Sequence, residues 1–215
     1  MDVNIFWEII GKYNNQTIII QMLLFILLII SFTLSYTGKI KWFIKFVLGV
    51  SNIYIGIVFF GYFGTENIQK YFALPLFLLL GILFIFECIK NKNDTIKILN
   101  KMQIILLVLY IIYPAISLLL GNKYPKMVTY IMPCPLISLS IIIYVGYENK
   151  NKLLLIIMAL WVLTGIKAFF ANAYEDIILL ICGIYFIIIL IKEYKNKKME
   201  YGTTAHNRSV YACGG

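Results

Sequence analysis

Histidine is almost absent from this sequence. The one histidine, His206, lies in a C-terminal stretch of unusual composition. Histidine is the commonest general base in enzymes and the commonest metal ligand. The sequence also has no His-Glu-x-x-His, Gly-x-Ser-x-Gly, P-loop or Gly-x-Gly-x-x-Gly motif. These absences argue against a zinc hydrolase, a serine hydrolase, an NTPase and a dinucleotide-dependent enzyme. We therefore expect no cofactor, and the absence of these motifs argues against an enzyme without excluding one.

Charge is also scarce. Only 13% of the 215 residues are charged while 61% are hydrophobic, and the mean hydropathy is +0.87. A soluble domain is about a quarter charged. The apolar residues form runs close to the roughly 20 residues that a helix needs to cross a membrane. The sequence therefore predicts one all-α domain, a polytopic transmembrane bundle of seven helices, at residues 17–36, 42–63, 71–89, 102–120, 129–147, 153–170 and 176–191.

The lysine distribution predicts the orientation of this bundle. With the N-terminus outside, fourteen of the 19 basic residues fall in cytoplasmic segments. The five others are Lys12, Lys70, Lys123, Lys126 and Lys167. The positive-inside rule then favours an outside N-terminus and a cytoplasmic C-terminus. We expect a multi-pass protein of the cell (plasma) membrane, the inner membrane of a bacterium, whose basic residues meet lipid headgroups and not nucleic acid. The oligomeric state stays open.

The two ends of the chain differ from the predicted seven-helix domain, residues 17–192. Apolar residues at helical spacing in 1–16 predict a short amphipathic helix on the outer surface, and an ordinary chain terminus is the alternative. Residues 193–215 are first basic and then change in composition, and they contain the only arginine, Arg208. We predict a disordered tail there, interpret it as an expression-derived extension, and assign it no function.

Two prolines stand where the fifth span should form, in Pro133-Cys134-Pro135. Proline breaks a helix interior but is tolerated in the first turn. A helix from Pro135 to Glu148 would be about 20 Å long, short of the roughly 30 Å that a span requires. Residues 128–135 should therefore lie at membrane depth, as a distorted helix or an extended segment. Such backbone is tolerated only inside protein or beside an aqueous cavity. We interpret the motif as the wall of an outward-facing cavity, and a purely structural kink is the alternative.

Three further residues are predicted near this motif. Cys134 and Cys182 each fall about five residues into a span that begins outside, so they should share a depth. Two thiolates suit a soft metal such as Cu(I) or Zn, although buried structural cysteines are the commoner arrangement. Asp176 begins the last span and Lys167 lies near the outer end of the sixth. We expect these two to form a charge pair at the cavity mouth, with Cys134 just below it.

The chain resembles a family of bacterial seven-span membrane proteins whose function is unknown. The similarity covers residues 3–191 and is most specific at Gly121, Tyr124-Pro125 and Pro133-Cys134-Pro135. Further residues that match the family's pattern are Trp161, Gly165, Asp176 and Gly183. The resemblance implies the fold and topology, and it adds Tyr124 to the candidate site. Family members tend to carry histidine where this chain has Asn122, and threonines where it has Leu136 and Ile137. The resemblance implies no activity.

These observations lead to three candidate functions. The first is transport or binding of a small solute or ion in an outward-facing cavity near Pro133-Cys134-Pro135. The second is a membrane sensor or interaction protein that carries no cargo. The third is a membrane enzyme with Cys134 as its nucleophile, for which the sequence shows no adjacent base.

Overall fold

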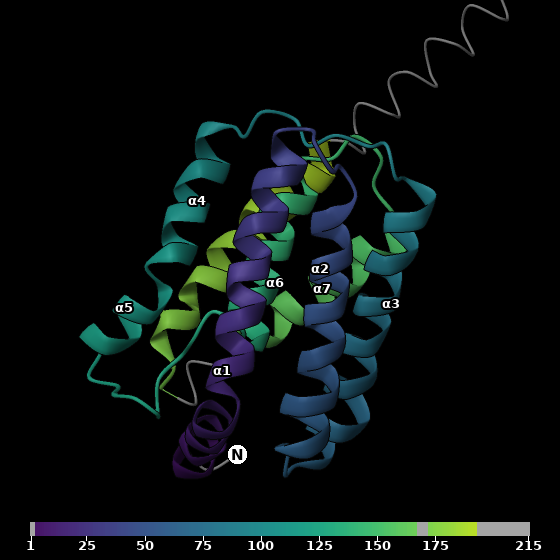
Figure 1. Cartoon of the computed structure of the whole chain (residues 1–215). Helices are drawn as coiled ribbons and strands as arrows, with labels where there is room; N and C mark the ends of the chain where they lie inside the picture. The colour runs from purple at the N-terminus through teal and green to yellow at the C-terminus, as the bar shows by residue number, and fades with distance from the viewer. Residues whose placement is uncertain (1–2, 167–171, 193–215) are drawn as a thin grey trace, which may run out of the picture.

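The computed structural model describes residues 3–166 and 172–192, and these are almost entirely helical (Figure 1). The elements in chain order are α1 (Val3–Tyr36), α2 (Phe43–Tyr54), η1 (Ile55–Tyr62), η2 (Gln69–Ala73), α3 (Leu74–Lys90), α4 (Lys101–Ile111), α5 (Tyr113–Leu119), α6 (Pro133–Tyr144), α7 (Lys152–Thr164) and η3 (Tyr174–Asp176). η3 is the first turn of an apolar helix, Tyr174–Lys192, called the C-terminal helix below. η1 and η2 are π-helical turns, which extend α2 and precede α3.

Four of these helices are long and apolar enough to cross a membrane: Val3–Tyr36, Phe43–Tyr62, Gln69–Lys90 and Tyr174–Lys192. α4 and α5 meet at a bend of 52°, and they make a fifth span if the bent pair is counted as one. The outward surface carries large apolar side chains, among them Ile19, Ile89 and Leu119, which are 73%, 72% and 86% exposed. An apolar surface of this extent is compatible with a protein embedded in lipid.

The sequence predicted seven spans, and two of the predicted runs contain shorter helices. Within 129–147 the helix α6 has 12 residues, and within 153–170 the helix α7 has 13. At 1.5 Å per residue these helices are about 18 and 20 Å long, so neither spans the hydrocarbon core as a straight helix. Proline also explains the bend in the run 102–120, since Pro114 lies in the first turn of α5.

Helix α1 is one continuous element of 34 residues. The sequence predicted a separate surface helix over 1–16, but the described part of that segment has no break from the following span. Its first turns run in a different direction from the rest of the helix (Figure 1). Ile10, Tyr13 and Asn14 are fully buried, so this part of α1 packs against the bundle. Ile9 and Ile10, two of the apolar residues that suggested membrane contact, are buried by protein, whereas Ile5 is 45% exposed.

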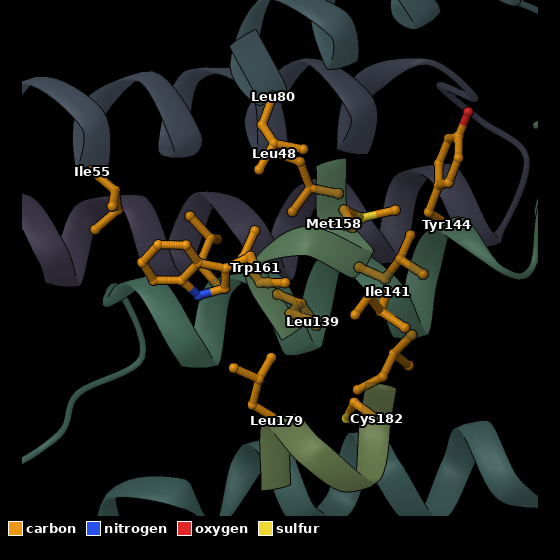
Figure 2. Close-up of a cluster of buried hydrophobic side chains, with 14 of the residues drawn as sticks. Leu48, Ile55, Leu80, Leu139, Ile141, Tyr144, Met158, Trp161, Leu179 and Cys182 are labelled. Atoms are coloured by element: carbon orange, nitrogen blue, oxygen red, sulfur yellow. The ribbon is translucent and has the colours of Figure 1, made fainter. Parts of the chain in front are cut away.

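Helix α6 lies at the centre of the bundle. Eleven of its 12 residues are buried, and the exception is Cys134. Side chains from several helices meet around it (Figure 2). They include Leu48 of α2, Leu80 of α3, Leu139 and Ile141 of α6, Met158 and Trp161 of α7, and Leu179 and Cys182 of the C-terminal helix. The run 129–147 is apolar because protein surrounds it.

Helices α2 and α3 approach most closely at two glycines. A Cβ on Gly49 would lie 3.0 Å from the Gly81 carbonyl oxygen, and a Cβ on Gly81 would lie 2.7 Å from the Gly49 oxygen. Gly56 of η1 likewise faces Leu78 of α3. Small residues let helix backbones approach closely and so increase van der Waals contact between them. Such contact matters in a bilayer, because the hydrophobic effect does not drive helices together in lipid.

Polar side chains of α1 hold the non-helical segment 121–132, which connects α5 to α6. Asn14 donates hydrogen bonds from Nδ2 to the carbonyl oxygens of Pro125 (2.7 Å) and Met127 (2.8 Å). Thr129 Oγ1 donates to Gln21 Oε1 at 2.6 Å. Tyr13 Oη donates to the Ile131 oxygen at 2.6 Å. Backbone without helical hydrogen bonds needs such partners when water is excluded. Residues 13–21 are therefore the support on which this segment rests.

Replacing Asn14 by leucine should loosen this connection. The Asn14→Leu change leaves two carbonyl groups without their donors, and each lost partner costs about 1–3 kcal/mol when the group stays buried. We expect faster hydrogen–deuterium exchange across 121–132 and a lower melting temperature. Thr33→Val is the matched control, because Thr33 bonds only within its own helix at an exposed position. Equal exchange in both variants would show that Asn14 does not support the segment.

Candidate functional site

A cavity of about 470 Å³ is lined by residues from the beginning of α1 and from η1 and η2, among others. The beginning of α1 lies at the end of the bundle marked N in Figure 1. The beginning of α1, the turns η1 and η2 and the connection between them form one part of the cavity wall. The start of α6, the end of α7 and the start of the C-terminal helix form another part. The lining residues are Phe6, Ile10, Phe59, Phe60, Glu66, Ile68, Gln69, Phe72, Ala73, Val128, Met132, Pro133, Cys134, Pro135, Trp161, Thr164, Gly165 and Asp176. The cavity is largely apolar, with a few polar groups.

The Pro-Cys-Pro motif begins α6. Met132 is extended, with φ −131° and ψ 162°, and Pro133 and Pro135 occupy the first turn of the helix. Proline is tolerated there because the first-turn N–H groups have no partners within the helix. The first hydrogen bond runs from the Leu136 N–H to the Met132 oxygen at 2.9 Å. The prolines thus start a short helix, and 121–132 is the extended entry segment. Cys134 faces the cavity from the first turn.

Asp176 lies opposite Cys134 in this cavity. Its carboxylate is 6% exposed and accepts a hydrogen bond from the Tyr113 hydroxyl at 2.5 Å. The Cys134 thiol also lies close enough to this carboxylate to interact with it. Asp176 comes from the first turn of the C-terminal helix, where a negative charge is favoured by the helix dipole. The three elements α5, α6 and the C-terminal helix therefore meet at one carboxylate.

A second carboxylate, Glu175, lies behind the first and is fully buried. Its Oε1 accepts hydrogen bonds from Ser117 Oγ at 2.7 Å and Asn122 Nδ2 at 3.3 Å. Ser117 Oγ in turn accepts the Val128 N–H at 3.1 Å. Glu175 thus connects α5 to the entry segment of α6. The other oxygen, Oε2, is buried and has no hydrogen-bond partner among the described residues.

The structure brings together four of the six residues predicted for the solute site. Pro133, Cys134, Pro135 and Asp176 all line the cavity. Tyr124 does not line it; this side chain is 51% exposed, and its hydroxyl approaches the Asn14 oxygen at 3.4 Å. Lys167, and with it the predicted charge pair with Asp176, lies outside the described residues.

Cys182 was predicted at the same depth as Cys134, with a soft metal as one possibility. Its side chain is fully buried and interacts with Ser138, one turn further along α6 from Cys134. Cys182 does not line the cavity. Within residues 3–166 and 172–192, no three histidine, cysteine or acidic side chains are grouped as a metal ion would require. This geometry favours the structural interpretation of Cys182.

Sequence reasoning missed the aromatic lining and undervalued two polar residues. Tyr113 and Ser117 are polar residues within the apolar run 102–120, and neither is among the predicted site residues. They bind the two carboxylates, Asp176 and Glu175. Their spacing of four residues was the available signal, since it places both on one face of a helix. Trp161 had no such signal, because an apolar helix carries aromatic residues on every face.

The fold and cavity define a bundle of apolar helices, compatible with a membrane-embedded protein, with a largely apolar pocket at one end. The chain belongs to DUF6064, a family of unknown function whose profile matches residues 3–201. No curated protein and no solved structure matches the chain. The function must therefore be argued from the cavity itself.

Proposed function

We propose that this protein binds a small solute in the cavity in front of Pro133-Cys134-Pro135 and carries it across the membrane. The cavity of about 470 Å³ is the observation that supports the proposal. Ligand pockets typically measure about 300–1,000 Å³ and combine apolar walls with a few polar groups. Here the polar groups include Cys134 and Asp176, which come from segments far apart in the sequence.

The interruption of helical backbone beside the cavity favours transport of the solute over binding alone. Secondary transporters often build their sites from discontinuous helices, where freed backbone groups and helix ends contact the cargo. Here α6 begins only at Pro133, after an extended segment, and the C-terminal helix begins at the cavity wall. In the orientation predicted from the lysines, this end of the bundle faces outward. The cavity would then receive its solute from outside the cell.

Thiol labelling tests whether solutes reach Cys134. We expect a water-soluble maleimide, added outside intact cells, to label Cys134 in a variant whose other cysteines are serine. The control is a variant that keeps only Cys182, which is fully buried and should remain unlabelled. Labelling of Cys134 should also fall when a bound solute fills the cavity. If Cys134 resists the reagent as completely as Cys182 does, the cavity is closed to water and the proposal fails.

One observation favours the third candidate function as well. The Cys134 thiol lies beside the Asp176 carboxylate in a cavity, which is the arrangement of a nucleophile with a possible base. The same negative charge disfavours the thiolate, so a reactive cysteine would need a compensating cation. If Cys134 is a nucleophile, iodoacetamide should alkylate it at neutral pH much faster than an ordinary exposed thiol. Slower alkylation would exclude an enzyme that uses Cys134 as its nucleophile.

A further inference from the structure

Five aromatic side chains among the described residues line the cavity. Phe6 comes from α1, Phe59 and Phe60 from η1, Phe72 from η2 and Trp161 from α7. Some of these rings are fixed by edge-to-face contacts. Phe60 packs against Phe59 with 5.0 Å between ring centroids, and against Trp161 with 5.5 Å. An aromatic face attracts a cation through its quadrupole, and rings held in place lose no freedom when they bind one.

The charges on the described lining residues are both negative. Glu66 and Asp176 line the cavity, and the described part of the lining contains no lysine or arginine. The partners of Asp176 in the described chain are hydroxyl and thiol groups, from Tyr113 and Cys134. Within residues 3–166 and 172–192, these neutral donors leave the negative charge of Asp176 without a cation beside it. A buried carboxylate beside an apolar cavity therefore stabilises a positive ligand more than any other kind.

A further polar group lies on the cavity wall. Trp161 is 8% exposed, and its Nε1–H makes no hydrogen bond of normal geometry to the described residues. The nearby Cys134 sulfur is a weak acceptor at best. A buried indole N–H usually finds an acceptor. This N–H can donate to an acceptor atom on a ligand, but a donor does not attract positive charge, so only the face of the Trp161 ring bears on the charge of the ligand.

From the aromatic lining and the negative charges we propose that the ligand is an organic cation with apolar substituents, a substituted ammonium or a similar ion. Its charge lies against Asp176 and over the aromatic faces, and its apolar groups fill the rest of the cavity. The inference rests on the proposed function, since it names the class of solute that this same cavity takes. Inorganic cations fit poorly, because the walls offer them few oxygen ligands.

Three probes of similar size and different charge test this inference. They are benzyltrimethylammonium, its uncharged carbon analogue neopentylbenzene, and benzenesulfonate as the anion. Equilibrium dialysis with the purified full chain in detergent gives the dissociation constants. We expect the cation to bind at least about tenfold more tightly than the uncharged analogue, a difference typical of one favourable charge contact. The anion should bind most weakly of the three.

Variants locate the effect in the cavity. Asp176→Asn should weaken binding of the cation by about tenfold and leave the uncharged analogue unchanged. Glu148→Gln is the matched control, since Glu148 is 63% exposed and lies away from the cavity. Phe72→Leu removes one ring at a partly exposed position, so the variant should still fold. It should weaken binding of the cation by about threefold.

The outcomes separate this inference from the proposed function. One contrary result is that the uncharged analogue binds as tightly as the cation, and another is that Asp176→Asn leaves the affinity for both probes unchanged. Either result would show that the cavity is only apolar and that its ligand is not selected for positive charge. The proposed function then still stands if Cys134 is labelled and a probe protects it. Tighter binding of benzenesulfonate would equally overturn the inference. If Cys134 is inaccessible and no probe binds, both proposals fail.

Discussion

Gly81→Leu should prevent the protein from folding stably. A side chain at this position has no room, because a Cβ alone would lie 2.7 Å from the Gly49 oxygen and 3.0 Å from the Ile53 nitrogen. Both are backbone atoms of the facing helix α2, so rotamer changes cannot relieve the overlap. The helices would have to separate, and the packing of Phe77 and Leu80 would be lost with their contact. Overpacking of this kind typically costs about 1–3 kcal/mol or more.

The effect should also reach the cavity, because α2 and α3 carry its walls. Phe59 and Phe60 continue α2 through η1, and Ala73 precedes α3. We expect the variant to aggregate on size-exclusion chromatography and to lose probe binding. Ile82→Leu is the control, since Ile82 is the next residue of α3 and is 58% exposed. If both variants elute and melt like the parent protein, the close approach of the two helices is not required for folding.

Lys45→Met should destabilise the protein by about 3–5 kcal/mol, which is the usual cost of removing one partner from a buried ion pair. Lys45 is fully buried. Its ammonium lies 3.4 Å from Asp94 Oδ2 and 4.0 Å from the centre of the Tyr147 ring. Without it, the Asp94 side chain, 6% exposed, would keep a negative charge with no cation beside it. The buried Glu87 lies nearby and would add repulsion. Thermal unfolding in detergent measures the loss.

Two comparisons make this result specific. Lys97→Met breaks an exposed ion pair with Glu148, in which both side chains are more than 60% exposed, and should cost less than about 1 kcal/mol. The double variant Lys45→Met, Asp94→Asn removes both charges and should recover part of the lost stability. If Lys45→Met costs no more than Lys97→Met, the buried pair does not contribute as its geometry indicates.

Several features of this protein follow from the sequence by itself. Long apolar runs with few charges predict helices, since only a helix satisfies its own backbone in an apolar medium. Asparagine before an apolar run also marks where a helix begins. Asn100 and Asn151 cap α4 and α7, accepting the N–H groups of Gln103 and Leu153. Proline locates the bend before α5 and the start of α6. Each of these signals acts over a few neighbouring residues.

Which apolar runs are buried within the protein was decided only by the tertiary structure. A helix buried in protein and one immersed in lipid need the same side chains, so composition alone cannot distinguish α6 from a span. The partner of each buried polar group is equally non-local. Tyr113 meets Asp176 across 63 residues, Asn14 meets Met127 across 113, and Lys45 meets Asp94 across 49. The sequence marks these residues as costly to bury, but only the packing of helices determines which of them meet and where a cavity is left between them.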